Sequence, residues 1–153
     1  MKLVIVESPK KCDTIAKYLG AEYKVVATKG HIRDLATCGK GGLGVDVDNN
    51  FKPTYKIPGV KYKLIEELRK LARQADEVIL ATDPDREGEA ISWHLAEVLN
   101  LDIEKTKRLE FHEITREAIE YAIKNPRTLD LNLVASQEAR RIIDRIMGFK
   151  LSA

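Results

Sequence analysis

Hydrophobic residues along the chain follow two alternating patterns, and together these patterns predict the secondary structure. Short apolar runs bounded by turn residues are typical of buried strands, and apolar residues three or four positions apart are typical of amphipathic helices. The expected strands comprise residues 3–6, 23–28, 77–82 and 107–111, and the expected helices comprise residues 9–19, 61–75, 87–99 and 116–124. Because strands alternate with helices, right-handed crossovers should produce an α/β fold with a mainly parallel sheet and helices on both faces.

Local capping signals support several of these boundaries. Ser8 and Pro9 supply an N-cap hydroxyl and a proline at the first helical position, and Gly20 provides the corresponding stop. Thr115 is placed to cap the helix that runs to Lys124. The first strand should therefore pass through a tight turn directly into a helix.

Two parts of the chain depart from the alternation. Residues 39–59 hold five of the nine glycines and two of the five prolines, so we expect a long irregular excursion there. After Pro126 a single long helix pattern begins at residue 130 or 131 and runs to Met147. We therefore expect one domain over residues 1–125. Residues 126–153 should be the linker and first helix of an adjoining domain, cut short in a truncated chain.

Composition excludes several classes of protein. With 44% hydrophobic and 33% charged residues in 153, the chain is not disordered, collagen-like or stapled by disulfides. Cys12 and Cys38 lack a C-x-x-C spacing, so we interpret both as free thiols. The chain has no membrane-length apolar stretch and no signal peptide pattern, which predicts a soluble cytoplasmic protein with no membrane partner.

The net charge of +2 conceals an uneven distribution. Residues 1–40 hold eight Lys and Arg against four Asp and Glu, whereas residues 83–89 hold four acids against Arg86 alone. A basic surface beside a dense acidic segment suits a polyanion that is handled together with a divalent cation.

Acidic side chains follow two of the predicted strands. Glu7 comes after the first strand, and Asp83, Asp85 and Glu87 come after the third. Carboxyl ends of parallel strands share one edge of a sheet, where ligands bind, and crowded carboxylates there repel one another. Mg²⁺, held by one or two carboxylates with waters and a substrate phosphate, would relieve that repulsion. The alternative is a solvated acidic turn that caps the next helix.

Basic residues offer candidate phosphate and nucleic-acid contacts. Lys10 and Lys11 lie in the first turn of a predicted helix, where the helix dipole disfavours cations unless an anion binds there. In the last helix Arg141 and Arg145 share a face, which suits a nucleic-acid backbone. Arg140 is spaced to pair with Asp144, and His31 lies near Arg33 in a loop. Solvated lysines and a salt-bridged helix face are the alternatives.

Taken in order along the chain, these segments resemble the N-terminal part of type IA DNA topoisomerases, more the bacterial topoisomerase I branch than the topoisomerase III branch. The acidic motif alone is shared with primases, some nucleases and type II topoisomerases through the Toprim fold, but the order of six blocks is more specific. The blocks are V-E-S-P with Lys11 and Thr14-Ile15, G-H-I-R-D-L at 30–35, G-V-D at 44–46, T-D-P-D-R-E-G-E-A-I at 82–91, H-E-I-T at 112–115, and Gln137 with A-R-R at 139–141 and Asp144-Arg145.

The resemblance implies a Toprim domain and an enzyme that relaxes negatively supercoiled DNA without ATP. Such an enzyme cleaves one strand through a 5′-phosphotyrosine, passes the other strand and reseals. Its partners would be Mg²⁺, single-stranded segments of the DNA and the remaining domains of the same polypeptide, in the cytoplasm at the nucleoid. The implied roles are acid/base catalysis for Glu7; Mg²⁺ binding for Asp83, Asp85 and Glu87, with a contribution from Glu7; phosphate positioning for Lys11 and Arg86; and DNA contacts for His31, Arg33, Arg140, Arg141 and Arg145.

One part of the family's machinery is missing from this sequence. The tyrosines stand at positions 18, 23, 55, 62 and 121, and none has the sequence context of the family's nucleophile. Without that nucleophile no covalent intermediate forms, so we expect the isolated chain to bind Mg²⁺, and DNA weakly, without relaxing DNA. Two other hypotheses remain: a haloacid-dehalogenase-type phosphohydrolase with Asp83 as nucleophile, and a metal-dependent nucleic-acid binding module without catalysis.

Overall fold

A computed structural model describes residues 1–35, 44–46, 52–53 and 55–152. A four-stranded parallel sheet lies at its centre, with strand order β2-β1-β7-β8. The strands are β1 (Lys2–Val6), β2 (Tyr23–Ala27), β7 (Glu77–Leu80) and β8 (Lys107–Arg108). The predicted parallel sheet is thus confirmed. The last strand is shorter than expected, and Arg108 also forms an isolated antiparallel bridge with Arg127.

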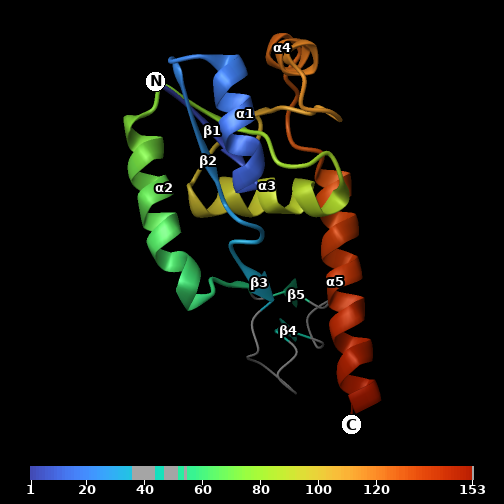
Figure 1. Cartoon of the computed structure of the whole chain (residues 1–153). Coiled ribbons are helices and arrows are strands. Elements are labelled where there is room, and N and C mark those ends of the chain that lie inside the picture. The colour runs from blue at the N-terminus through green and yellow to red at the C-terminus, as the bar shows by residue number, and fades with distance from the viewer. Residues whose placement is uncertain (36–43, 47–51, 54, 153) are drawn as a thin grey trace.

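Five helices connect or follow these strands (Figure 1): α1 (Pro9–Leu19), α2 (Tyr62–Gln74), α3 (Arg86–Val98), α4 (Arg116–Lys124) and α5 (Leu131–Ser152). The expected ends agree to within a residue or two, except that α5 continues beyond Met147. Thr115 caps α4 by accepting the backbone N–H of Ala118 at 3.2 Å, as its position predicted. Ser8 has the extended backbone of an N-cap, although its hydroxyl makes no capping hydrogen bond.

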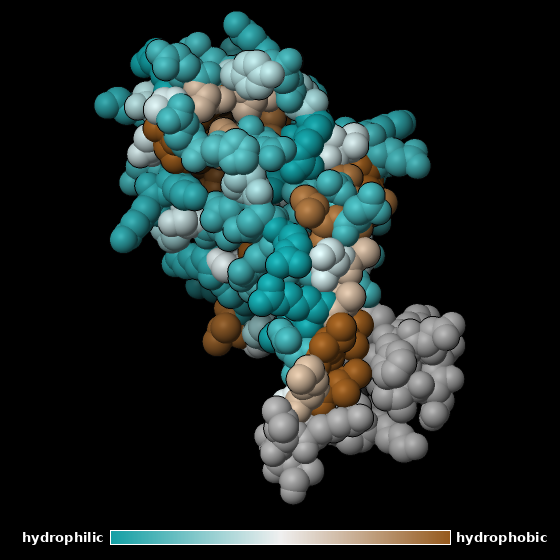
Figure 2. All heavy atoms as spheres, turned by 90° about the vertical axis from the view of Figure 1, so that its right-hand side faces the viewer, coloured by the Kyte–Doolittle hydropathy of each residue, from teal (hydrophilic) through white to brown (hydrophobic). Residues whose placement is uncertain are grey.

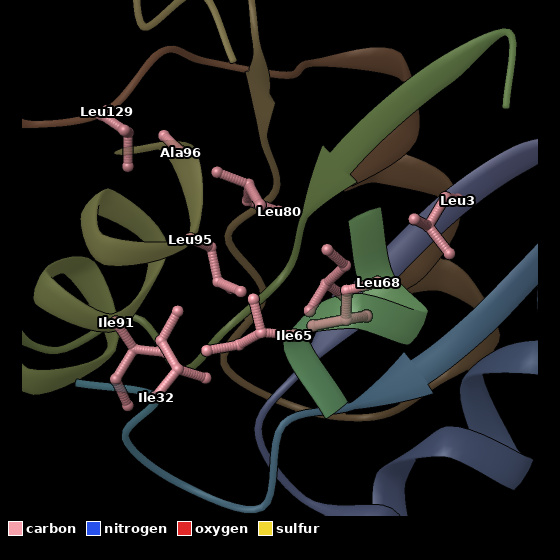
Figure 3. Packing of buried hydrophobic residues seen from close by; sticks show 10 residues of the cluster. Leu3, Ile32, Ile65, Leu68, Leu80, Ile91, Leu95, Ala96 and Leu129 are labelled. Atoms are coloured by element: carbon pink, nitrogen blue, oxygen red, sulfur yellow. The ribbon is translucent and has the colours of Figure 1, made fainter. Parts of the chain in front are cut away.

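Two hydrophobic clusters cover opposite faces of the sheet. On one face Leu3, Ile5 and Leu80 pack with residues of α2 and α3, and Figure 3 shows this packing around Leu68 and Leu95. On the other face the buried side chains come from the strands and from α1 and α4: Val4, Val6, Ile79, Ile15, Ile119 and Ala122. The helices therefore lie on both faces, as predicted, because successive residues of the central strands point to opposite sides and both sides are apolar.

The expected irregular excursion is not wholly irregular. Its described residues form β4 (Val45–Asp46) paired with β5 (Lys52–Pro53), and β6 (Tyr55–Lys56) paired with β3 (Asp34–Leu35), all antiparallel. A short 3₁₀ helix, η2 (Gly59–Lys61), then leads into α2. The remainder of the excursion, and Cys38 with it, lies outside the described residues. Cys12 is a free, half-buried thiol, as expected.

The last helix packs its N-terminal half against α3 and then continues away from the sheet (Figure 1). Figure 2 shows hydrophobic surface along its C-terminal half, where Ile143 and Met147 are 55% and 56% exposed. Among the residues that the structure describes, no helix has the length and apolar character needed to cross a bilayer.

Candidate active site at the carboxyl edge of the sheet

The ends of β1 and β7 bring Glu7 and Asp83 together. The two strands are neighbours in register, with Ile5 beside Leu80, so the residues that follow them emerge at the same edge. Oε1 of Glu7 accepts the backbone N–H of Asp83 at 2.7 Å. Gly88 lies directly beneath this contact, because a Cβ there would be 1.9 Å from the Asp83 carbonyl oxygen and 2.9 Å from Oε1 of Glu7. Glu7 and the acidic turn 83–87 therefore form one site.

The surroundings of Glu7 favour its protonated form. Desolvation by partial burial raises the pKa of this carboxyl, and the charges of Asp83, Asp85 and Glu87 raise it further. The hydrogen bond from the Asp83 backbone partly opposes this rise in the pKa. A half-buried carboxyl with a raised pKa is suited to hold a proton and release it to a nearby reacting group.

The three carboxylates of the acidic turn each have a partner of their own. Oδ1 of Asp83 accepts a hydrogen bond from Nζ of Lys11 at 2.8 Å. Asp85 caps α3, because its Oδ1 accepts the backbone N–H of Gly88 at 2.6 Å. Oε1 of Glu87 lies 2.8 Å from Nε2 of His31. The turn therefore does serve as a helix cap, through Asp85, while its other two acids face cationic or titratable side chains.

The residues have the chemistry that Mg²⁺ prefers, because every candidate ligand is a carboxylate. Burial first, and then the charges of the other three carboxylates, raise the pKa of Glu7. Within the described ranges, however, no three His, Cys, Asp or Glu side chains are grouped so that they could hold a metal ion. Mg²⁺ needs only one or two carboxylates when waters and substrate phosphates complete its shell.

The first turn of α1 places only one of its two lysines in the site. Lys11 is half-buried and reaches Asp83, whereas Lys10 is exposed. The contact with Asp83 explains a cation at this unfavourable end of a helix. Arg86, at the start of α3, is exposed and donates from Nη1 to Oγ of Ser136 on α5 at 3.4 Å.

The candidate DNA contacts are not equivalent. Arg33 has a side chain only 16% exposed, stacks over Tyr55 and Trp93 with its guanidinium carbon 4.7 and 5.2 Å from the ring centres, and pairs with Glu97. Its Nε also donates to Nδ1 of His94 at 2.5 Å. Burial lowers the pKa of His94 to about 3, so this imidazole is neutral and can accept. Arg33 therefore connects the loop before β3 to side chains of α3 and to Tyr55 of β6.

A small pocket, partly open to solvent, lies between α3, α5 and the loop before β3. His31, Arg33 and Arg141 all line it. Both Nε and Nη2 of Arg141 donate to the carboxylate of Asp34, at 2.9 Å for Nε. Arg140 is exposed on α5, and Arg145 is partly buried and has contacts of its own. The roles of these arginines in binding DNA stay predictions.

Sequence reasoning missed a buried ionic network behind the acidic turn. Glu89 and Arg108 have no exposed surface, and Nε of Arg108 donates to Oε1 of Glu89 at 3.0 Å. Glu89 is one of the four acids of residues 83–89, and its burial separates it from the other three. Arg108 was the available signal, because an arginine inside a predicted buried strand needs a partner.

Two comparisons with known proteins bear on this site. The model of the Toprim domain family matches residues 2–114. The full-length structure of topoisomerase I from Thermotoga maritima superposes with a TM-score of 0.86 and is 46% identical in sequence. That alignment covers 94% of this chain and 24% of the topoisomerase, so the chain spans about a quarter of the length of the protein it matches.

Proposed function

Since the chain belongs to the Toprim domain family, we propose that it is the N-terminal part of a type IA DNA topoisomerase that relaxes negatively supercoiled DNA. The observation that carries the proposal is the meeting of Glu7 with the acidic turn at the edge of a parallel sheet. The 46% identity to a topoisomerase I over nearly the whole chain supports it. An enzyme acting on bacterial chromosomal DNA would work in the cytoplasm, at the nucleoid, and we propose that location for this protein.

In this proposal the chain supplies acid/base chemistry and phosphate positioning. Attack of a tyrosine phenolate, whose proton has passed to solvent, on a DNA phosphate forms the Tyr O–P bond and breaks the P–O3′ bond, and the departing 3′ oxygen takes the proton that Glu7 holds. Resealing reverses the step and returns the proton to Glu7. Lys11 and Arg86 position the phosphate. Mg²⁺, with Asp83, Asp85, Glu87 and Glu7 as candidate ligands, would neutralise charge on the phosphate when bound.

The nucleophile has to come from outside these 153 residues. Tyr55 lines the pocket beside the site, but burial raises its pKa, and the nearby Glu138 raises it further. A phenol of raised pKa is a poor source of the phenolate that attacks phosphorus. The isolated chain should therefore bind Mg²⁺ and single-stranded DNA weakly, without relaxing DNA.

The adjoining domain is proposed to begin after residue 125. Contacts cross this boundary: Arg127 donates from Nη1 to Oε2 of Glu89 at 2.8 Å, and the backbone N–H of Asp130 donates to the same oxygen at 2.7 Å. The linker is therefore fastened to α3, and α5 begins from a defined position relative to the acidic turn. The rest of the polypeptide is the proposed partner of α5.

The test is a chimera in which this chain replaces the corresponding quarter of Thermotoga maritima topoisomerase I. Relaxation of a negatively supercoiled plasmid is then measured. We expect relaxation by the chimera and none by residues 1–153 alone. Glu7→Gln should lower the rate at least about 100-fold, the usual contribution of a general acid. The exposed Glu22→Gln is the matched control. Normal relaxation by the Glu7 variant would contradict the proposed role.

The same proteins separate the other two hypotheses. A haloacid-dehalogenase-type enzyme would hydrolyse a phosphate monoester, and Asp83→Asn would abolish that turnover. A binding module without catalysis would bind single-stranded DNA in a metal-dependent way, yet its chimera would not relax the plasmid. Either result would replace the topoisomerase proposal.

A further inference from the structure

Behind the acidic turn, the guanidinium of Arg108 is fixed by four hydrogen bonds. Nε donates to Glu89, Nη1 donates to the carbonyls of Thr82 and Leu109, both at 2.7 Å, and Nη2 donates to the carbonyl of Asp83 at 2.8 Å. The Asp83 carbonyl belongs to the acidic turn itself, and the Thr82 carbonyl directly precedes it. Resting on the function proposed above, we propose that Arg108, held by Glu89, is a positioning residue that sets the backbone of the acidic turn for metal and phosphate binding.

The first argument is the cost of burying the pair. Both side chains are completely buried, and a buried ion pair often adds no net stability over apolar residues of similar volume. The pair instead fixes the orientation of the hydrogen bonds, because a planar guanidinium donates along fixed axes. Here those axes end on consecutive carbonyls, of Thr82 and Asp83, at the point where β7 gives way to the site.

The second argument is the connection from Arg108 to the proposed acid. Asp83 is held from both sides, since its carbonyl accepts from Arg108 while its N–H donates to Glu7. Its side chain accepts from Lys11. A shift of this one peptide would therefore move Glu7, Asp83 and Lys11 together, although none of them touches Arg108 through its side chain in the contacts described.

The third argument is that a second arginine of the network, Arg127, provides a matched control for Arg108. Arg127 shares the Glu89 carboxylate with Arg108, at 2.8 and 2.9 Å from its two Nη atoms. The other hydrogen bonds of its side chain among the described residues go to Glu110 and to the Thr128 carbonyl. Changing Arg127 therefore perturbs the same buried carboxylate without removing a hydrogen bond from the turn.

The experiment compares Arg108→Lys and Arg127→Lys in the 153-residue chain. Mn²⁺ affinity is measured by electron paramagnetic resonance, and hydrogen exchange of the Asp83 amide by NMR. A lysine keeps the charge but cannot reach both carbonyls in the same geometry. Arg108→Lys should weaken Mn²⁺ binding about 10- to 100-fold, as loss of a group that orients metal ligands does, and should speed exchange at Asp83. Arg127→Lys should leave both unchanged.

Equal Mn²⁺ affinity and equal exchange at Asp83 in the two variants would overturn the positioning role, even if both variants lose stability. If the unmodified chain binds no Mn²⁺, the metal part of the proposed function fails, and faster exchange at Asp83 in Arg108→Lys alone would still uphold the positioning role. Should Arg108→Lys not fold, Glu89→Gln replaces it, because it removes the charge that holds Arg108. Unchanged exchange at Asp83 in folded Glu89→Gln would then refute the inference.

Discussion

Gly88 is the position where one added methyl group should do the most local damage. It is the third residue of α3, and an alanine Cβ there would lie 1.9 Å from the Asp83 carbonyl oxygen, 2.8 Å from its carbon and 2.9 Å from Oε1 of Glu7. Ordinary contacts with a carbon atom begin at about 3.5 Å. The helix and the acidic turn must therefore move apart by more than an ångström, and the moving atoms are mostly backbone.

Two opposing contributions set the size of the effect. Alanine in a helix interior gains about 1 kcal/mol over glycine. Overpacking costs about 1–3 kcal/mol, and stretching the hydrogen bond between Glu7 and the Asp83 N–H adds about 1 kcal/mol or more. We expect Gly88→Ala to lower the free energy of unfolding by about 1–3 kcal/mol in total, and to weaken Mn²⁺ binding through displacement of the turn.

Urea denaturation measures this difference, with Gly148→Ala as the matched control. Gly148 lies in α5, and no heavy atom of the described residues lies within 4 Å of a Cβ built there. The control should gain up to about 1 kcal/mol from helix propensity. If Gly88→Ala proves as stable as the unmodified chain and binds Mn²⁺ equally well, the close packing of α3 against the turn is not what holds the site.

Three further predictions concern stability. Burial lowers the pKa of His94 to about 3, below its unfolded value of about 6.5, so this contribution to stability is lost as pH falls from 6.5 toward 3. Between pH 6.5 and pH 5 the free energy of unfolding, measured by urea denaturation, should fall by about 1.6 kcal/mol more than it does in His94→Gln. Glu89→Ala leaves Arg108 buried without its counter-charge and should cost about 3–5 kcal/mol at neutral pH, read from the same curves; a loss below 1 kcal/mol would contradict it. Thr115→Ala removes the cap of α4 and should lower the free energy of unfolding by about 1 kcal/mol, which thermal denaturation detects as a lower midpoint. Thr115→Ser keeps the capping hydroxyl and should not lower the midpoint.

Most of the fold could be predicted because its signals are local. The alternation of strand and helix patterns, the proline after Ser8 and the hydroxyl of Thr115 each act within a few residues. The meeting of Glu7 with Asp83 also followed from sequence, because adjacent parallel strands deliver their carboxyl ends to one edge. The short antiparallel pairing of β3 with β6 was missed, since its partners are far apart in sequence and only two residues long.

By itself the sequence determined which segments become strands and helices, and that four carboxylates stand at the ends of two strands. Only the tertiary structure decided which charged side chains are exposed and which are buried. It buried Glu89 against Arg108 and packed Arg33 against Tyr55 and Trp93, while it left Glu87 exposed beside His31. The physical reason is that hydrogen bonding and helix propensity act over a few residues. The cost of a charge depends on everything that packs around it, from any part of the chain.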